Sequence, residues 1–217
     1  MELRNEEEWL KLRKEVVTAT EIPILLGLNK WSSPSKMLKE KQDSTFTGNA
    51  FTRIGQLLEP VVVEVVNEVL HEKFALLEKD GVKIMYVHSN LPIGATPDAC
   101  NGEMFLECKT TKPFNYLKYR NCPPEYYIMQ LIVQLYCANM KVGYLAIMST
   151  NLSQETADLN YPISIFKVVK NEKLCSLMEA EVSRFFRLTK EGKMYRVNTT
   201  TKLKARLLIQ ISIIQVI

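Results

Sequence analysis

Cysteine and histidine are both scarce in this sequence, and their arrangement argues against two common ways of stabilising a small domain. The five cysteines among 217 residues are widely spaced, odd in number and form no C-x-x-C pair, and only His71 and His88 could add nitrogen ligands. A disulfide framework needs paired cysteines, and a structural zinc site needs about four clustered thiolate or imidazole ligands. We expect neither, and reduced thiols in a cytosol are the simplest interpretation.

Long apolar runs are absent as well. No apolar stretch reaches the length of about 18 residues that a membrane-spanning helix needs, so no such helix is predicted. The segment Met1–Glu15 is highly charged and lacks the apolar core of a signal peptide. We therefore expect a protein of the cell interior that is not secreted and has no membrane partner.

What remains is the composition of an ordinary globular domain. Hydrophobic residues make up 47% of the chain and charged residues 24%, which allows a sizeable core. The net charge of +4 permits a nucleic-acid partner without requiring one. Because no internal repeat or low-complexity linker divides the chain, we predict a single domain over residues 1–200, followed by a tail over 201–217.

The tail is apolar and rich in β-branched residues from Leu203 to Ile217, and the stretch TTTKLKAR at its start has a linker-like, basic character. It could be an edge strand, a partner-binding segment or a sequence altered by frame disruption. An exposed apolar end would promote aggregation. We therefore expect this end to be covered by the domain or by another subunit.

The hydrophobic spacing predicts alternating blocks of helix and strand. Helices are expected over about 5–17, 20–27, 47–72, 124–138 and 171–189, with one more opening at 33–34; strands are expected over about 74–77, 82–87, 93–98, 104–109, 142–148 and 163–169. Asn5 and Thr20 are the expected helix caps, and Pro60 predicts a break or kink beside Glu59. This order indicates an α/β (α+β) domain with a mixed central β-sheet flanked by helices.

The segment TPDACNGEMFLECKT carries the most chemical information. Asn101–Gly102 is a strong hairpin turn, so it brings Asp98 near Glu107 on the following strand. Residues two apart on a strand share a face, so Glu107 and Lys109 project together while the residue between them points to the core. Two carboxylates and an ammonium on one face repel or exchange protons unless a cation organises them, and Mg²⁺ is a suitable cation because it prefers hard oxygen ligands. The plainer interpretation, solvent-exposed charges on a hairpin, would fit the triplet alone.

Further residues narrow the choice. The pattern Pro97-Asp98 … Glu107-Cys108-Lys109 resembles the PD-(D/E)xK nuclease signature. Three other blocks, Leu10–Gly27, Gly55–Val62 with its G-x-x-x-E-P pattern, and Tyr127–Tyr136 with its Y-x-x-Q pattern, resemble the lambda-exonuclease and YqaJ-type viral recombinase family of that superfamily. The four blocks occur in the family's order over residues 10–136. The chain departs from the family in having Thr20 where serine is usual, which keeps the hydroxyl, and a cysteine between the catalytic glutamate and lysine.

The resemblance implies a restriction-endonuclease-like core and a role for each matched residue. Asp98, Glu107 and the main-chain carbonyl of Cys108 would bind Mg²⁺, or Mn²⁺ as a substitute, and Lys109 would act on the attacking water. Glu59 would help to hold a second metal ion, and Gln130 would orient the lysine or the water. Arg13 and Thr20 would bind the phosphate at a DNA 5′ end, for which the guanidinium fork is suited.

The resemblance thus implies an exonuclease that digests double-stranded DNA from its ends in phage or viral recombination or in DNA repair. The cytoplasm, or the nucleus for a eukaryotic virus, would be its location. A homo-oligomer, such as a ring trimer, and a single-strand annealing protein are the partners it implies. An endonuclease with the same centre and a non-catalytic DNA-binding recombination accessory protein are the alternatives. An iron–sulfur nuclease, which needs an early cysteine, is disfavoured because the first cysteine is Cys100.

Overall fold

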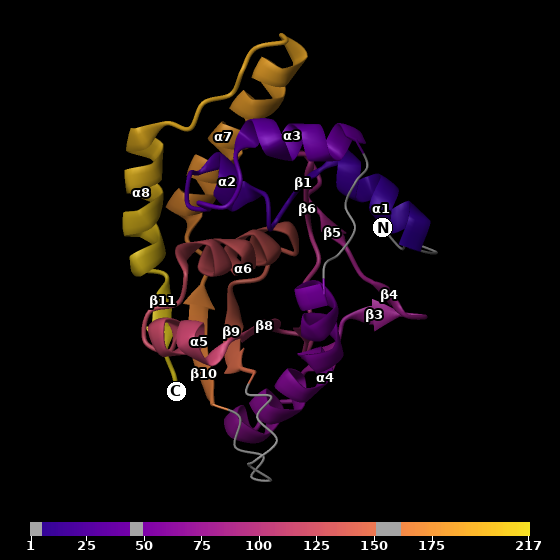
Figure 1. Ribbon diagram of the computed structural model, residues 1–217, viewed down its shortest axis with the longest axis vertical. Helices are drawn as coiled ribbons and strands as arrows, with labels where there is room; N and C mark the ends of the chain where they lie inside the picture. Colours follow the sequence, from indigo (N-terminus) through magenta and orange to yellow (C-terminus); the bar gives the residue numbers. More distant parts are fainter. Residues whose placement is uncertain (1–5, 44–49, 151–161) are drawn as a thin grey trace.

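A six-stranded mixed sheet forms the centre of the computed structural model, which describes residues 6–43, 50–150 and 162–217 (Figure 1). The strands run in the order β11-β10-β9-β8-β7-β2, and only the pair β8–β9 is parallel. Their bounds are Ala75–Leu76 for β2, Ala99–Cys100 for β7, Phe105–Thr111 for β8, Val142–Ser149 for β9, Ile163–Val169 for β10 and Ile213–Gln215 for β11. The mixed sheet flanked by helices that the sequence predicts is therefore confirmed.

The parallel pair needs a crossover, and the helices α5 (Pro113–Tyr119) and α6 (Glu125–Cys137) provide it. All seven residues of β8 pair with β9, from Phe105 opposite Gly143 to Thr111 opposite Ser149. Gly143 is required for this approach, because a Cβ there would lie 2.9 Å from the carbonyl oxygen of Phe105. The strand that carries the predicted site is thus paired along its whole length with β9.

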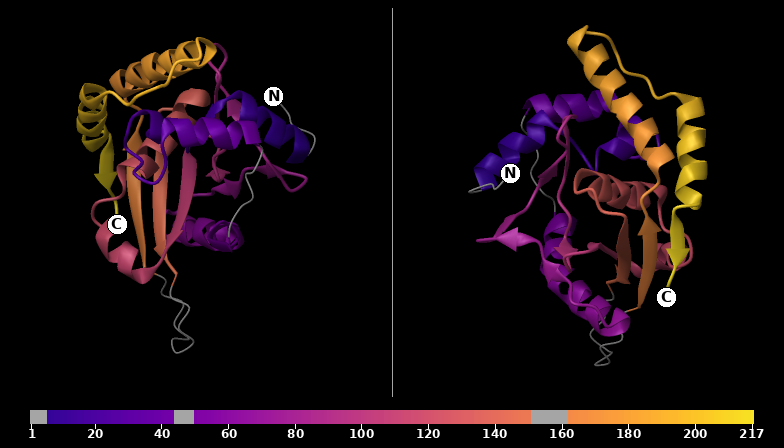
Figure 2. Two further views of the ribbon diagram at one scale, coloured as in Figure 1. Left: turned by 45° about the horizontal axis from the view of Figure 1, so that its top comes forward. Right: turned by 180° about the vertical axis from the view of Figure 1, so that it is seen from behind.

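Helices cover both faces of the sheet, and the side chains of β8 alternate between two cores. On one face, Phe105 packs into the larger core, to which α6, α2 (Ile22–Leu25), α7 (Glu172–Lys190) and α8 (Thr199–Gln210) contribute (Figures 1 and 2). On the other face, Leu106 and Cys108 pack beneath the long helix α4 (Ala50–Leu70). The prediction that Cys108 points into the core is confirmed.

Two smaller sheets complete the fold. The strands β1 (Val17–Thr18), β6 (Ile93–Ala95) and β5 (Tyr86–Val87) form one of them, and the hairpin of β3 (Glu78–Lys79) and β4 (Val82–Lys83) forms the other. Asp80 and Gly81 turn this hairpin with φ angles of 52° and 75°, as the Asp-Gly pair predicts. The helices α1 (Glu6–Glu15) and α3 (Pro34–Asp43) lie at the same end of the molecule (Figure 1).

Several local predictions were wrong. Helix α4 continues through Pro60, so the break that was one of the two alternatives there, break or kink, does not occur. Pro60 and Gln56, whose carbonyl loses its partner, both lie on the exposed side, where water can satisfy that carbonyl. The strand expected over 93–98 ends at Ala95, so Asp98 lies in the connection to β7. The cap of α2 is Glu21 rather than Thr20. The other expected cap, Asn5, lies outside the described residues.

The C-terminal segment is helix and strand rather than linker. Asn198 caps α8, since its side-chain oxygen accepts hydrogen bonds from the amides of Thr200 and Thr201 at 2.9 and 3.2 Å. The strand β11 then pairs with β10 at the sheet edge, which is the edge-strand alternative. The predicted domain end at residue 200 therefore falls inside a helix. Within the described part of the chain, no helix is long and apolar enough to cross a membrane.

Candidate active site

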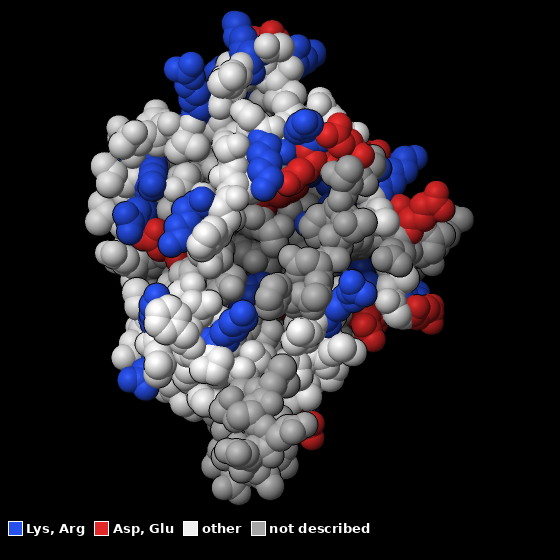
Figure 3. All heavy atoms as spheres, in the orientation of Figure 1, with Lys and Arg blue, Asp and Glu red and all other residues white. Residues whose placement is uncertain are grey.

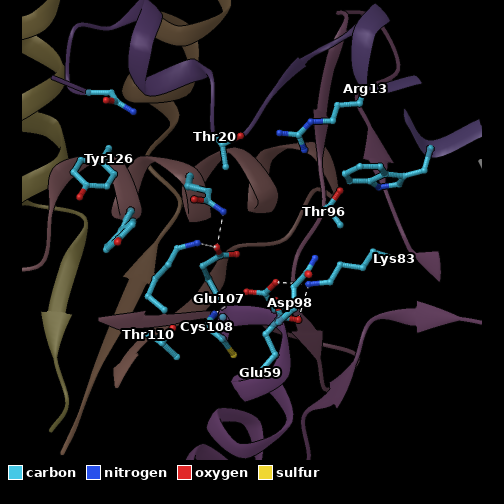
Figure 4. A pocket seen from close by; sticks show the side chains of 17 residues that line it. Arg13, Thr20, Glu59, Lys83, Thr96, Asp98, Glu107, Cys108, Thr110 and Tyr126 are labelled. Atoms are coloured by element: carbon cyan, nitrogen blue, oxygen red, sulfur yellow. Dashed lines mark hydrogen bonds and ion pairs between the residues drawn. The ribbon is translucent and has the colours of Figure 1, made fainter. Parts of the chain in front are cut away.

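One cavity of about 570 Å³ collects every side chain that the sequence singles out (Figure 4). It lies beside β8 and below α6, and residues of α1 and α4 also line it (Figure 4). The residues predicted for the site all line it: Arg13, Thr20, Glu59, Asp98, Glu107, Cys108, Lys109 and Gln130. They come from segments that are up to 117 positions apart in the chain, and their roles remain predictions at this point.

Glu107 and Lys109 lie on the same face of β8, as strand alternation predicts. The Lys109 ammonium donates a hydrogen bond to Oε1 of Glu107. The carboxylate of Glu107 is buried, with its side chain only 1% exposed. A buried carboxylate needs several donors to be tolerated.

Two glutamines of α6 supply these further donors. Gln130 donates to Oε1 of Glu107, and Gln134 donates to Oε2 at 2.5 Å. The sequence analysis missed Gln134, although its spacing of four from Gln130 in an otherwise apolar helix was a usable signal, because residues at i and i+4 share a helix face. Burial, followed by the charge of Asp98, raises the pKa of Glu107 to about 7, even though Lys109 and Gln134 act in the opposite direction.

Asp98 is tied to both neighbouring elements. Its Oδ2 accepts a hydrogen bond of 2.9 Å from the main-chain amide of Cys108, and its Oδ1 lies 3.0 Å from the Nζ of Lys83. The same Nζ lies 2.6 Å from Oε2 of Glu59. Lys83, on the hairpin strand β4, is thus a member of the cluster that the sequence analysis missed. Burial and the charge of Asp98 raise the pKa of Glu59, while Lys83 opposes that rise.

The donor set of this cluster fits a divalent cation. No group of three His, Cys, Asp or Glu side chains among the described residues is close enough to chelate a metal ion unaided. Mg²⁺, however, commonly takes only one or two protein carboxylates and completes its shell with water and substrate phosphate. Asp98, Glu107 and the main-chain carbonyl of Cys108 offer such hard oxygen atoms beside the cavity. Burial, with the charge of Asp98 adding to its effect, raises the pKa of both Glu59 and Glu107, and a bound cation would favour the ionised form of both carboxyls.

Arg13 and Thr20 lie at the other end of the cavity (Figure 4). The Arg13 guanidinium stacks 5.2 Å from the ring centroid of Trp9, and burial lowers the pKa of Arg13 below its ordinary value. The Thr20 hydroxyl lies 3.0 Å from that of Thr18. A guanidinium and a hydroxyl beside a shared cavity can bind an anion of the size of a phosphate.

A lysine from a distant helix holds this end of the cavity in place. The Nζ of Lys41, on α3, lies 2.9 Å from the carbonyl oxygen of Arg13 and 2.7 Å from that of Val16. It also lies 2.9 Å from a carboxylate oxygen of Glu21, which accepts a hydrogen bond from the amide of Thr18. Lys41 therefore fixes the chain on both sides of the segment that carries the phosphate-binding candidates.

Aromatic side chains of α6 form the cavity wall next to Lys109. The Lys109 ammonium lies 5.3 Å from the ring centroid of Tyr127, and the rings of Tyr126 and Tyr127 meet edge to face at 4.6 Å. Both line the cavity, whereas Tyr116 is buried and shares a hydrogen bond with Ser164. Tyr116 is therefore a core residue, and Tyr126 and Tyr127 are the aromatic candidates for contact with a substrate.

On the face of the protein that Figure 3 shows, positive charge is not concentrated in one patch. Lys and Arg side chains are dispersed across this face, and acidic side chains gather along its right-hand side (Figure 3).

The comparisons with known proteins agree with the fold and the block order. Residues 8–141 match the family described as the YqaJ-like viral recombinase domain. The uncharacterized protein YqaJ of Bacillus subtilis (strain 168) is 26% identical over 133 residues, which are 58% of this chain and 40% of that protein. The match thus spans less than half the length of this curated relative.

Two solved structures share the fold at low sequence identity. An alkaline exonuclease, LHK-Exo from Laribacter hongkongensis, superposes with a TM-score of 0.67 at 19% identity, covering 95% of this chain and 100% of that chain. A phage-related exonuclease from Haemophilus somnus 129PT gives 0.60 at 14% identity, covering 85% and 100%. The family match covers more than half of the sequence, and the chain therefore belongs to the YqaJ-like viral recombinase domain family.

Proposed function

We propose that this protein is a metal-dependent deoxyribonuclease that hydrolyses phosphodiester bonds from the ends of double-stranded DNA. The observation that supports this best is the shared cavity, which unites three carboxylates, two lysines and Gln130 with Arg13 and Thr20. Hydrolysis needs the first set, and recognition of a terminal phosphate needs the second. The names of the two exonucleases with the same fold agree with this assignment.

Each side chain has a task in the proposed reaction. Asp98, Glu107 and the carbonyl of Cys108 would hold Mg²⁺ or Mn²⁺, which polarises the scissile phosphate and acidifies bound water. Lys109, which donates to Glu107, is placed to orient the attacking water and to stabilise negative charge on the phosphate. Gln130 donates to the same oxygen of Glu107 as Lys109 does, which helps to keep the lysine and the carboxylate in their relative position.

The far end of the cavity sets where the DNA begins. We propose that Arg13 and Thr20 bind the 5′ phosphate of a strand, so that the next phosphodiester bond reaches Lys109. The rings of Tyr126 and Tyr127 provide stacking surfaces for an unpaired base near the cut. A homo-oligomer such as a ring trimer and a single-strand annealing partner, active in viral-type recombination, belong to the same proposal and rest on the family resemblance.

The first experiment uses linear and covalently closed circular duplex DNA with Mg²⁺. The proposal predicts degradation of the linear form only, complete loss with a chelator, and loss of at least about 100-fold in rate for Lys109→Met, the size typical for removal of one charge-stabilising group. Lys118→Met, an exposed change of the same kind on α5, serves as the matched control. Cutting of the circle would favour the endonuclease alternative, and full activity of Lys109→Met would favour a non-catalytic DNA-binding role.

A second experiment tests the phosphate end of the cavity. Arg13→Met is expected to reduce the preference for a 5′-phosphorylated over a 5′-hydroxyl end, measured as the ratio of kcat/KM values on otherwise identical duplexes. Lys11→Met, at an exposed position on the same helix, is the control. An unchanged ratio in Arg13→Met would remove Arg13 from the proposed site.

A further inference from the structure

Lys83 lies between two of the three carboxylates in the cavity. Its Nζ is 2.6 Å from Oε2 of Glu59 and 3.0 Å from Oδ1 of Asp98. The three side chains come from separate elements, namely α4, the hairpin strand β4 and the connection before β7, and they converge at the lower side of the cavity (Figure 4). The Lys83 side chain is 27% exposed, so it is part of the cavity wall rather than a surface group.

This position is the one that a second divalent cation would require. The family resemblance assigns Glu59 to a second metal ion, and such an ion would share the carboxylate of Asp98 with the first. Mg²⁺ binds oxygen at about 2.1 Å. Since the oxygen atoms of Glu59 and Asp98 that face each other already contact the Lys83 ammonium, a metal ion bound to the same pair would meet a like charge at close range.

The formal charges at the carboxylate end of the cavity also argue against a second divalent cation. At the carboxylate end of the cavity, opposite the end that Arg13 lines, the three carboxylates of Glu59, Asp98 and Glu107 face the two ammonium groups of Lys83 and Lys109, which leaves one formal negative charge there. One divalent cation reverses this to a single positive charge, whereas two would leave three positive charges in a partly buried site. Excess charge of one sign is unfavourable where water screens it poorly. Without Lys83, two cations would be balanced far better.

We propose that Lys83 takes the place of a second metal ion, so that this centre binds a single divalent cation. An ammonium has three N–H donors, of which Glu59 and Asp98 take two. The third can donate to a phosphate oxygen of the substrate, which is the charge-neutralising task that a second cation would perform. Lys83 also joins α4 to the Asp98 segment and is thereby a positioning residue for Asp98. This inference rests on the proposed function and concerns only the number of cations.

The test counts Mn²⁺ ions bound per chain, by electron paramagnetic resonance of free Mn²⁺ and by calorimetric titration of the full chain without DNA. The wild-type protein is expected to bind one ion, and Lys83→Met is expected to bind two. Adding Glu59→Gln to Lys83→Met should remove the second ion again. Lys79→Met, on the same hairpin but outside the residues that line the cavity, should bind one ion as the wild type does.

The outcomes separate this inference from the proposed function. If the wild type bound two ions, or a folded Lys83→Met bound only one, the inference that Lys83 replaces a second metal ion would be wrong. The nuclease proposal would be unaffected by either result. No Mn²⁺ binding to the wild type would contradict the nuclease proposal itself. If circular dichroism shows that Lys83→Met does not fold, Lys83→Gln is the second variant for the same count, and the wild-type stoichiometry remains decisive.

Discussion

Gln134 offers the sharpest test of how the protein controls the charge of Glu107. Its side-chain amide is fully buried and donates to Oε2 of Glu107, while its own Oε1 has no hydrogen-bond partner. Gln134→Met removes the donor at nearly constant side-chain volume. A hydrogen bond to a charged group contributes about 1.5–3 kcal/mol, and a pKa unit corresponds to about 1.4 kcal/mol. The pKa of Glu107 should therefore rise from about 7 by about 1–2 units.

The direction of the expected pH shift depends on which protonation state of Glu107 metal binding and folding require. Only the ionised carboxylate binds a cation, so the acidic limb of the pH profile of kcat/KM, measured at a subsaturating Mg²⁺ concentration, should move to higher pH by the same 1–2 units. In the metal-free protein, a folded pKa raised from 4.5 to about 7 gives stability that is present below pH 4.5 and is lost as the pH rises through about 7. In Gln134→Met this loss should continue to a higher pH.

The control is Leu131→Met, a volume-conserving change at a buried position of the same helix. It should leave the acidic limb where the wild type has it. If Gln134→Met also leaves the limb in place while remaining folded, ionisation of Glu107 does not govern metal-dependent activity, and the reasoning from its burial is refuted.

Two further predictions concern the frame around the site. Ile209→Ala should lower the free energy of unfolding by about 3 kcal/mol, because Ile209 is only 1% exposed and lies in the main core. This value combines about 0.8 kcal/mol for each buried carbon removed with a contribution from the cavity that is left. Leu207→Ala, at a position 65% exposed on the same helix, should change the free energy of unfolding by less than about 0.5 kcal/mol. If urea denaturation gave the same free energy of unfolding for both variants, α8 would lie outside the folded domain. Gly143→Ala should cost about 1–3 kcal/mol in the same assay, since its Cβ would lie 2.9 Å from the Phe105 carbonyl oxygen and 3.0 Å from Leu131. An unchanged midpoint for Gly143→Ala would contradict the close approach of β8 and β9.

The sequence predicts those parts of the site that depend on local geometry. Strand alternation places Glu107 and Lys109 on one face and Cys108 on the other, and the Asn101–Gly102 turn brings Asp98 back to the strand. These relations need only a period of two and a tight turn. They hold in the structure because all seven residues of β8 pair with β9 and its first two residues pair with β7.

The contact of Lys83 could not be predicted in this way. Lys83 contacts residues 15 and 24 positions away, in the connection before β7 and in helix α4, and nothing in its sequence neighbourhood distinguishes it from an ordinary surface lysine. Such contacts follow from how separate elements pack, which local patterns do not encode. Gln134 differs from Lys83, because a sequence signal for it exists. A glutamine in an otherwise apolar helix indicates that its side chain forms a hydrogen bond with another buried polar group.

The helix α8 was missed because its first turn is poor in helix formers. The residues Thr199–Thr201 are β-branched, which lowers helix propensity, so the stretch resembled a linker. The signal that could have revealed the helix is Asn198, a favourable N-cap. Burial of Ala205 and Ile209 against the core then outweighs the weak propensity.

The two walls of the cavity differ in how readily their backbones open. The strand β8, which carries Glu107 and Lys109, has a seven-residue ladder with β9 within the sheet, so hydrogen exchange of the amides in this ladder should require opening of most of the fold. Lys83 belongs to a hairpin held by two residue pairs, which should exchange through local opening. If the protein acts on DNA ends as proposed, the hairpin wall is expected to adjust to ends of different shape, while the wall that carries Glu107 and Lys109 stays fixed.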